Sequence, residues 1–300
     1  MKRTLRIGTR GSALALWQAH HARDLLLAAD AGLSVEIKVI KTKGDRIQDR
    51  SLADIGGKGL FVKEIQRALL VGDVDISVHS LKDYPAENPD GLAIVCTPER
   101  ADRRDALVCP VGGTEEALPS DAVVGTGSLR RRYQLAVIRR EWRSADLRGN
   151  VETRLRRVDE GDMDATVLAV AGLKRLGKQD RITRAFSVEE MIPAAGQGTV
   201  AVECRSDDAE LVSLLTALRY EDTWSETEVE RHFLSRLGAS CTTPVGFTAL
   251  VDGDAVSVHG FLASLDGSRH VRGSLQGARE EGRTLADSLC ETFEAQGFSF

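Results

Sequence analysis

Residues 5–19 read LRIGTRGSALALWQA, and residues 123–137 read VVGTGSLRRRYQLAV. Each stretch has a short apolar run, then Gly-Thr, then Gly-Ser, then a helix-like run in which an aromatic residue precedes Gln. This pattern is typical of a strand, a tight turn and a helix N-terminus, with Ser12 and Ser128 in the N-cap position. The fold that the sequence predicts follows from this repeated strand–turn–helix unit.

A second pattern repeats in the same order. Residues 61–83 (FVKEIQRALLVGDVDISVHSLKD) correspond to residues 150–174 (NVETRLRRVDEGDMDATVLAVAGLK). Each predicts a helix that ends at Gly-Asp-x-Asp, then a buried strand, then a loop with Leu-Lys. Strands that alternate with helices form mainly parallel sheets. We therefore expect two similar α/β domains, in residues 1–98 and 99–198, although two unrelated α/β segments can share such features by chance.

The pattern changes after residue 217. Residues 226–237 (ETEVERHFLSRL) predict an amphipathic helix, and residues 284–293 (TLADSLCETF) predict a closing helix. Between them, apolar runs that begin at Phe247 and Ala255 predict two strands joined by the turn sequence Val-Asp-Gly-Asp. Residues 218–300 therefore predict a smaller α+β domain.

The composition excludes several classes of protein. The chain has 300 residues with a net charge of −5, which argues against general affinity for nucleic acids. Its five cysteines are scattered without a Cys-x-x-Cys pair, which argues against a disulfide framework and against a structural metal site. Arg6 and Arg10 interrupt any apolar signal sequence, and no apolar run is long enough to span a membrane. A cytoplasmic protein is expected.

Arginines are concentrated where the predicted helices begin or strands end. They are Arg10, Arg130, Arg131, Arg132, Arg148, Arg154 and Arg175. Ligands of open α/β sheets bind at the carboxyl ends of the strands, and guanidinium groups bind carboxylates in bidentate fashion. The set predicts a cleft for a polyanion, and the alternative is a solvated basic face. Neither Gly-rich turn is a nucleotide-binding loop, because the Walker pattern is absent and Arg130 replaces the third glycine of GxGxxG.

Three further residues could carry chemistry. Asp83 ends the stretch VHSLKD, where a carboxylate can serve as a general acid or base or stabilise a developing cation, or can simply stabilise a turn. Lys58 is surrounded by glycines, as in a mobile loop. Cys241 lies between Gly238 and Pro244, so we expect it in a loop.

Nine stretches together resemble one enzyme family. They are IGTRGSALALWQA, GGKGLFVKEI, DISVHSLKD, RDALV, GTGSLRR, LRGNVETRL, LAVAGLKRLG, PAAGQG and LGASCTTPVG, which run in order from about residue 5 to residue 246. Each is moderately specific, and together they resemble the porphobilinogen deaminases, also called hydroxymethylbilane synthases. The last fifty or so residues carry little of the pattern.

The resemblance implies a transferase of tetrapyrrole (haem- and chlorophyll-type) biosynthesis. Its cofactor is a dipyrromethane that is attached through a thioether to Cys241. Four porphobilinogen molecules are added to this primer with release of ammonia, and water then releases hydroxymethylbilane. The implied catalytic carboxylate is Asp83, which stabilises positive charge on the pyrroles.

Other site residues are carried over from the family's motifs. Cofactor-binding residues are Lys82, Asp83, Thr126, Ser128, Arg130, Arg131, Arg148, Gly172, Gln197 and Gly198, and substrate-binding residues are Arg10, Ser12, Ser80, Arg148, Arg154 and Arg175, with Lys58 in a mobile loop. The implied fold has two similar domains like those of periplasmic binding proteins around a cleft, with residues 199–217 returning to the first, and a third domain that carries Cys241. A monomer is expected, whose product passes to a uroporphyrinogen-forming enzyme.

Two other functions fit parts of the sequence. A non-enzymatic carboxylate-binding protein of the same fold would need neither a reactive Cys241 nor Asp83. A nucleic-acid-binding module could use the cluster at Arg130 to contact phosphates, but the acidic net charge argues against it.

Overall fold

The computed structural model describes residues 4–42, 62–239 and 243–298. Lys58 and Cys241 therefore lie outside the described residues. The chain forms two compact units, residues 1–101 with 199–225 and residues 102–198 with 226–300. None of the helices in the described ranges has the length and apolar character that crossing a membrane requires.

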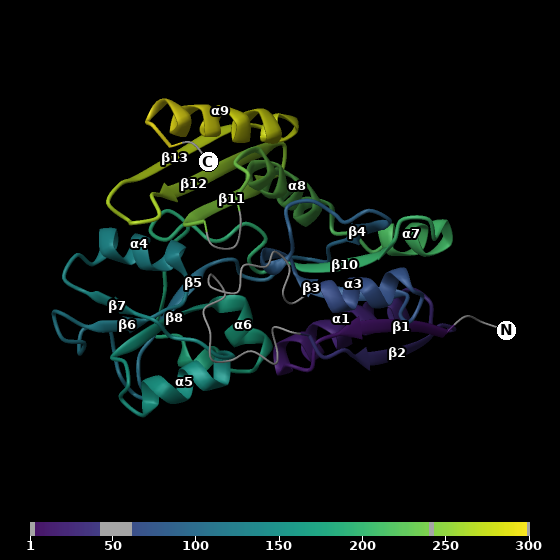
Figure 1. The fold of residues 1–300 in the computed structure, drawn as a ribbon, viewed down its shortest axis with the longest axis horizontal. Helices are drawn as coiled ribbons and strands as arrows, with labels where there is room; N and C mark the ends of the chain where they lie inside the picture. The colour runs from purple at the N-terminus through teal and green to yellow at the C-terminus, as the bar shows by residue number, and fades with distance from the viewer. Residues whose placement is uncertain (1–3, 43–61, 240–242, 299–300) are drawn as a thin grey trace. The chain divides into compact units, whose positions relative to one another are not determined.

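The first unit is an α/β sheet with helices on both faces (Figure 1). Its elements are β1 (Thr4–Thr9), α1 (Ala13–Ala29), β2 (Ser34–Val39), α3 (Lys63–Leu70), β3 (Ile76–Ser80), the 3-10 turn η1 (Leu81–Asp83), β4 (Leu92–Cys96), β10 (Val200–Arg205) and α7 (Ala209–Thr216). The strands lie in the order β2-β1-β3-β10-β4, and β10 alone among them runs antiparallel to its neighbours. The mainly parallel sheet that the sequence predicts is confirmed.

Three apolar clusters hold this sheet. One contains Leu26 of α1 and Leu215 of α7 together with Ile7 and Ile76 of the sheet. Another lies beneath α3 and includes Leu69, and a third includes Ile94 of β4. Because both faces are covered, β3 and β10 are buried along almost their whole length, as central strands in such folds are.

The second unit begins with a sheet of the same design. Its elements are β5 (Asp105–Val108), β6 (Val123–Gly125), α4 (Leu129–Ile138), β7 (Arg143–Ala145), α5 (Val151–Asp159), β8 (Ala165–Ala169), α6 (Val170–Arg175), the 3-10 turn η2 (Gln179–Arg181) and β9 (Arg184–Ala185). The order is β7-β6-β8-β5-β9, with β5 antiparallel to both neighbours. Strand for strand, this order matches that of the first sheet, so the duplication read from the sequence is real.

The repeated Gly-Asp-x-Asp motif has the same structural role in both copies. Asp75 exchanges hydrogen bonds with Arg6: its backbone N–H donates to the Arg6 carbonyl, and its carboxylate accepts from the Arg6 N–H at 3.0 Å. Asp164 does the same with Val123, whose N–H donates to the carboxylate at 2.7 Å. The second Asp of each motif thus fixes where the strand that follows it starts relative to its parallel neighbour, β3 relative to β1 and β8 relative to β6.

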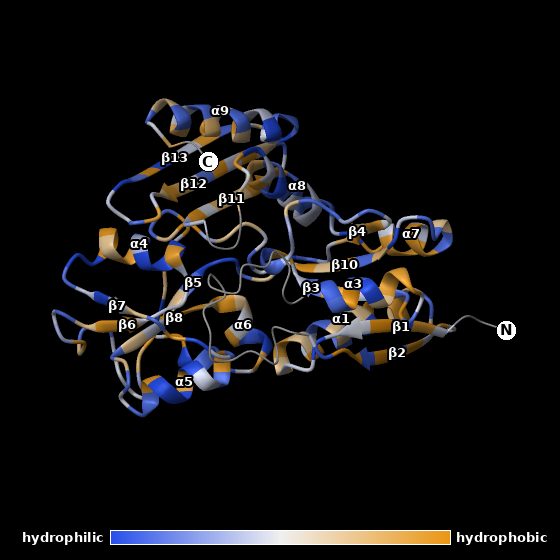
Figure 2. Ribbon diagram, in the orientation of Figure 1, coloured by the Kyte–Doolittle hydropathy of each residue, from blue (hydrophilic) through white to orange (hydrophobic). Residues whose placement is uncertain are grey.

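Residues 226–300 add a three-stranded antiparallel sheet with helices on one face. The elements are α8 (Glu221–Arg236), which begins in the first unit, β11 (Val245–Asp252), β12 (Ala255–Ala263), β13 (His270–Ala278), the 3-10 turn η3 (Arg279–Glu281) and α9 (Gly282–Ala295). Figure 1 shows α9 lying along this sheet, and Figure 2 shows polar and apolar residues mixed along it, as expected of a helix with one buried side. The sequence predicts β11, β12 and α9 but not β13.

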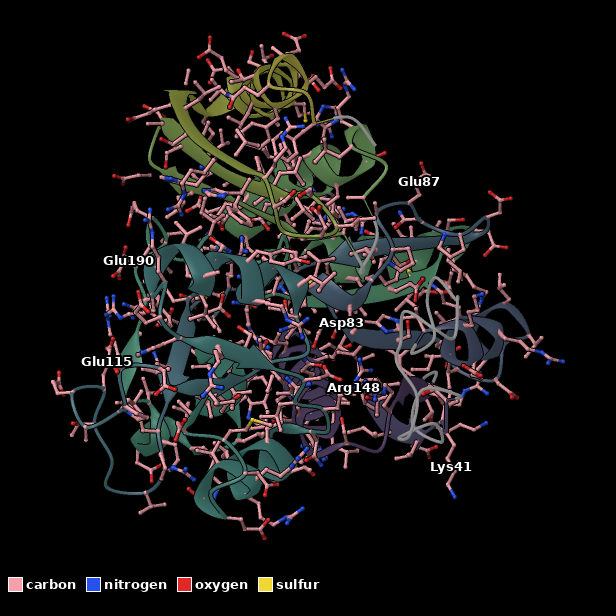
Figure 3. All side chains as sticks on the ribbon, turned by 60° about the vertical axis from the view of Figure 1, so that its left-hand side comes forward. Lys41, Asp83, Glu87, Glu115, Arg148 and Glu190 are labelled. Atoms are coloured by element: carbon pink, nitrogen blue, oxygen red, sulfur yellow. The ribbon has the colours of Figure 1, made fainter. Side chains whose placement is uncertain are left out.

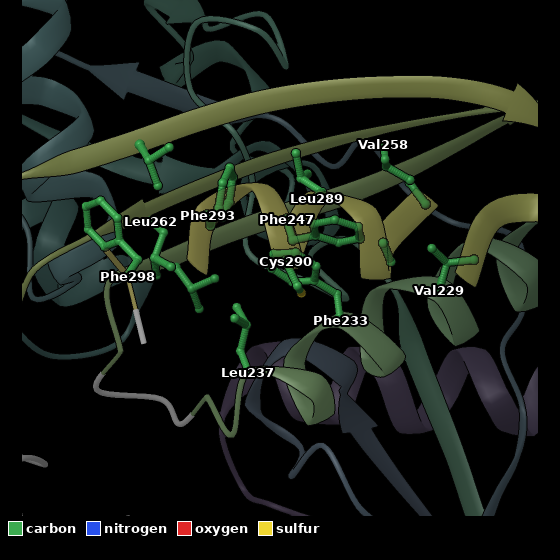
Figure 4. Close-up of a cluster of buried hydrophobic side chains, with 14 of the residues drawn as sticks. Val229, Phe233, Leu237, Phe247, Val258, Leu262, Leu289, Cys290, Phe293 and Phe298 are labelled. Carbon is green, nitrogen blue, oxygen red and sulfur yellow. The ribbon is translucent and has the colours of Figure 1, made fainter. Parts of the chain in front are cut away.

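Aromatic side chains form the core between this sheet and its helices (Figure 4). Phe233 of α8 stacks on Phe247 of β11 with ring centroids 3.8 Å apart. Phe293 of α9 meets Phe233 edge-on at 6.4 Å. Each of these rings is fully buried, so they carry much of the apolar stabilisation of this part of the chain.

Removing the central ring should destabilise this domain strongly. We expect Phe233→Ala to lower the free energy of unfolding by ~3–5 kcal/mol, because it leaves a cavity between α8 and the sheet. Urea unfolding followed by tryptophan fluorescence and circular dichroism measures the change. The matched control is Leu265→Ala, at a position that is 71% exposed, which should alter the midpoint little. Equal effects of the two substitutions would contradict this description of the core.

Candidate active site

The sequence-predicted residues of the first unit meet at one edge of its sheet. Strands β1 and β3 are parallel neighbours, with Ile7 opposite Ile76. Arg10 and Ser12 follow β1, whereas Ser80 ends β3 and η1 follows it. Since the carboxyl ends of parallel neighbours lie at the same edge, the structure brings these residues together.

Asp83 presents its carboxylate to solvent at this edge (Figure 3). It is the last residue of η1, and within the described residues its side chain makes no hydrogen bond or ion pair. Two neighbouring hydroxyls already have protein partners. The Ser80 hydroxyl accepts a hydrogen bond from Gln18 at 2.8 Å, and the Ser12 hydroxyl caps α1 by accepting from the Ala15 N–H. An acceptor without a protein partner on a short, well-ordered turn is suited to act on a ligand.

The second unit gathers its predicted residues at the corresponding edge. Strands β6, β7 and β8 are parallel, and after them come, respectively, the turn with Thr126 and Ser128, Arg148, and the helix with Gly172. Ser128 caps α4, as the sequence predicts, by accepting from the Arg131 N–H.

Close packing draws the turn after β6 onto the turn after β7. A Cβ on Gly127 would lie 3.3 Å from the Leu147 carbonyl oxygen and 4.0 Å from Arg148 Cγ. Because Gly127 has no side chain, the cap of α4 and the side chain of Arg148 can share one small region of the sheet edge.

Arg148 and Arg154 each donate a hydrogen bond near the turn after β7. Arg148 Nε donates to Asp146 at 2.7 Å, and both side chains are substantially exposed. Exposed ion pairs contribute about 0–1 kcal/mol, so a carboxylate ligand could replace Asp146 at little cost. Arg154 Nε donates to the Gly149 carbonyl at 2.8 Å.

Arg130 and Arg131 are not on a solvated basic face. Both are 5% exposed, and both bind the fully buried carboxylate of Asp105, which begins β5. Arg130 Nη1 lies 2.6 Å from Asp105 Oδ2, and Arg131 Nη2 lies 2.7 Å from Asp105 Oδ1. The remaining contacts are to main-chain carbonyls: Arg130 donates to Ile192, and Arg131 donates to Val167.

The cluster of Asp105, Arg130 and Arg131 has two positive charges and one negative charge. Burial alone would raise the pKa of Asp105, but the charges of the two arginines hold it well below its usual value. Two guanidinium groups thus share one carboxylate. Arg130 also keeps its Nε and Nη2 hydrogens without a partner in the described part of the chain. A buried excess cation with unused donors fits an anionic ligand such as the carboxylates of a dipyrromethane.

The start of β11 packs against Arg130. Gly246 in β11 lies so close to its neighbours that a Cβ there would be 2.7 Å from the Ile192 carbonyl oxygen and 3.3 Å from Arg130 Cδ. Cys241 precedes Gly246 by five residues in the sequence and lies outside the described residues.

Two further hydrogen bonds in the second unit involve predicted site residues: Arg175 with Gly198, and Gln197 with Asp105. Arg175 Nη2 donates to the Gly198 carbonyl at 2.7 Å, and burial lowers the pKa of Arg175 to about 10. Gln197 Nε2 donates to Asp105 Oδ1 at 3.0 Å. Asp105 thus joins three predicted site residues, yet the sequence analysis did not identify it; its only signal was its place in the family-like stretch RDALV.

Metal chemistry has no evident location in this structure. Among the residues that the structure describes, no three His, Cys, Asp or Glu side chains gather closely enough to hold an ion. The donor set at both sheet edges consists instead of guanidinium, hydroxyl and main-chain groups, which suit carboxylate ligands.

Removing the charge of Asp105 should destabilise the second unit. We expect Asp105→Asn to lower the free energy of unfolding by ~3–5 kcal/mol, because two buried guanidinium groups lose their counterion. The control is Asp146→Asn, which breaks an exposed pair and should cost at most about 1 kcal/mol. Because folding lowers the pKa of Asp105, its stabilisation is present above the unfolded-state pKa of ~3.9 and is lost as the pH falls toward the folded-state value. The gap between wild type and variant in urea unfolding should therefore narrow below about pH 4, and a constant gap would contradict this assignment.

Two family models and two curated relatives match this chain. The family model described as "Porphobilinogen deaminase, dipyromethane cofactor binding domain" matches residues 5–213, and that for "Porphobilinogen deaminase, C-terminal domain" matches residues 224–292. The porphobilinogen deaminase of Syntrophomonas wolfei is 46% identical over 293 residues, covering 96% of each chain. That of Roseiflexus castenholzii is 47% identical over 291 residues, covering 97% of this chain and 96% of its own.

Among solved structures, the methionine-binding protein MetQ covers 72% of this chain and 89% of its own with a TM-score of 0.46 at 14% identity. The chain itself forms two α/β sheets of matching strand order and a smaller domain with its own sheet, as expected from the resemblance. From the family models and the full-length relatives together, the chain belongs to the porphobilinogen deaminase family.

Proposed function

We propose that Asp83 is the catalytic carboxylate of this porphobilinogen deaminase and that Cys241 anchors its dipyrromethane through a thioether. The enzyme condenses four porphobilinogen molecules with loss of ammonia and then releases hydroxymethylbilane by hydrolysis. The observation that carries the role of Asp83 is its exposed carboxylate at the carboxyl end of β3, without a partner in the described ranges.

The chemistry requires an anion at this place. As the aminomethyl C–N bond of porphobilinogen breaks, nitrogen leaves with the bonding electrons as ammonia, and positive charge develops on the pyrrole. The Asp83 carboxylate stabilises that charge, and its oxygens can accept a hydrogen bond or a proton from a pyrrole N–H. When bound, the dipyrromethane supplies the pyrrole carbon to which the first substrate is joined.

Positively charged side chains bind the acid groups of the growing chain. Each pyrrole carries an acetate and a propionate, so every addition brings two more negative charges. Arg130, with its unused donors beside the start of β11, and Arg131 hold the cofactor with Lys82, Thr126, Ser128, Gly172, Gln197 and Gly198. Arg10, Ser12, Ser80, Arg148, Arg154 and Arg175 hold the substrate chain, and Lys58 belongs to a loop over it.

We also propose the organisation of the enzyme in the cell. Its domains are residues 1–98 with 199–217, residues 99–198 and residues 218–300, and the pairing of β10 with β3 and β4 supports the return of the chain to the first. It acts as a monomer in the cytoplasm and passes its product to a uroporphyrinogen-forming enzyme. These proposals rest on the family resemblance and on the scattered cysteines.

The mass of the intact protein tests the anchor. We expect the denatured protein to exceed its polypeptide mass by two porphobilinogens less two ammonias, and Cys241→Ala to lack this excess. Cys290→Ala, at a buried thiol in α9, is the matched control and should keep it. A bare wild-type mass that stays unchanged after incubation with porphobilinogen would contradict the thioether and favour a carboxylate-binding protein.

Turnover tests the carboxylate. Asp83→Asn should keep the fold and the added mass but lose at least ~100-fold in the rate of ammonia release, because the neutral amide cannot stabilise the developing cation. The control is Glu87→Gln, an exposed carboxylate four residues along the chain, which should turn over normally. Near-normal turnover of Asp83→Asn would remove Asp83 from this role.

A further inference from the structure

The sheet of the first unit contains a buried carboxylate that binds the residue after Asp83. Glu203 of β10 is fully buried and accepts hydrogen bonds from four side chains. Its Oε1 accepts from Tyr84 OH at 2.6 Å and Gln66 Nε2 at 3.1 Å. Its Oε2 accepts from Ser77 Oγ at 2.6 Å and lies 2.9 Å from His79 Nε2.

The donors match the acceptor capacity of an ionised carboxylate, which has about four lone-pair sites. Burial would raise the pKa of Glu203, but the hydrogen bond and charge of His79, followed by the hydroxyls of Ser77 and Tyr84, keep it below its usual value. The Glu203 side chain is therefore an anion inside the sheet, and both of its oxygens are held by hydrogen bonds. Such fully satisfied networks make a core rigid.

One of these donors belongs to the turn that carries Asp83. Tyr84 directly follows Asp83, is 4% exposed, and packs with Leu81 and Ile94. The turn is fixed at three points: the Leu81 N–H donates to the Thr199 carbonyl at 3.1 Å, the Tyr84 N–H donates to the Leu81 carbonyl at 3.0 Å, and Tyr84 OH donates to Glu203. Thr199 and Glu203 lie in one stretch of chain, directly before β10 and in the middle of it.

The Asp83 side chain has no such support of its own. Since its carboxylate bonds to no residue that the structure describes, its direction depends on the backbone of η1. A buried side-chain hydrogen bond at the end of this turn joins Tyr84 to Glu203. A displacement of a reacting group by about 1 Å can cost ~100-fold in rate.

We propose that Tyr84 and Glu203 are positioning residues for Asp83: the buried hydrogen bond between them sets the direction in which the Asp83 carboxylate points. This inference rests on the proposed catalytic role of Asp83. The competing explanation is that the bond only stabilises the sheet, in which case its loss would lower stability and leave turnover unchanged.

The test compares two hydroxyls that bind the same carboxylate. Tyr84→Phe removes the donor attached to the Asp83 turn and keeps the ring, whereas Ser77→Ala removes a donor that lies within β3. Both leave Glu203 one donor short and should lower the thermal midpoint similarly. We expect kcat of Tyr84→Phe to fall 10- to 100-fold with KM within about twofold and with the added mass intact, whereas Ser77→Ala should keep its kcat within about twofold.

A double-mutant cycle separates positioning from a general loss of structure. If Tyr84 acts through Asp83, adding Tyr84→Phe to Asp83→Asn should not lower kcat further, whereas independent effects would multiply. Glu203→Gln should reproduce the kcat loss of Tyr84→Phe. It should lower the thermal midpoint further, because the new amide NH2 would face groups that are themselves hydrogen-bond donors.

The possible results are distinct. Normal kcat in Tyr84→Phe, or equal kcat losses in Tyr84→Phe and Ser77→Ala, would overturn the positioning proposal while Asp83→Asn remained inactive. If Asp83→Asn itself turned over normally, the proposed catalytic role would fail, and the positioning proposal with it. Multiplying losses in the double mutant would also overturn the proposal, since Tyr84 would then act independently of Asp83.

Discussion

The second unit depends on one buried carboxylate that faces two guanidinium groups. In a medium of low dielectric constant, an ion without a counterion is costly, so Asp105 fixes where Arg130 and Arg131 can lie. The same group accepts from Gln197, and its position at the start of β5 ties the arginines to the antiparallel strand of the sheet. Two guanidinium groups against one carboxylate leave one positive charge unbalanced within this cluster, and Arg130 packs against the start of β11.

The first unit uses an equivalent strand for a different purpose. β10 is antiparallel within its sheet, as β5 is in the other, and it too carries a fully buried carboxylate. Glu203, however, is bound by two hydroxyls, an amide and an imidazole and by no guanidinium group, so no excess positive charge arises beside it. One duplicated scaffold therefore holds a buried carboxylate between two guanidinium groups in one copy and, in the other, a buried carboxylate that binds the turn of Asp83.

The sequence predicts well those features that depend on local patterns. The Ser12 and Ser128 caps, the strand before Asp83 and the helix that contains Cys290 all follow from short-range chemistry or periodicity. It does not predict β13, an edge strand whose exposed face is polar and whose inward face is interrupted by two glycines. Nor does it predict the partners of Arg130, because charged residues are usually exposed and Asp105 is 25 residues away. Such pairings arise only when crossover strands return to a sheet, which is a property of topology and not of local sequence.

The origin of β10 has a consequence for biosynthesis. The sheet that carries Asp83 is completed by a strand that is translated only after the whole second α/β segment, more than a hundred residues after β3. At ~5–20 residues per second, the ribosome takes roughly 5–20 s to produce that strand. Throughout this interval β3 and β4 lack the neighbour that separates them, and the donors around Glu203 have no acceptor. The nascent chain therefore passes through a stage in which the edges of an unfinished sheet are open to wrong pairing, and this places a demand on chaperones that a contiguous domain would not make.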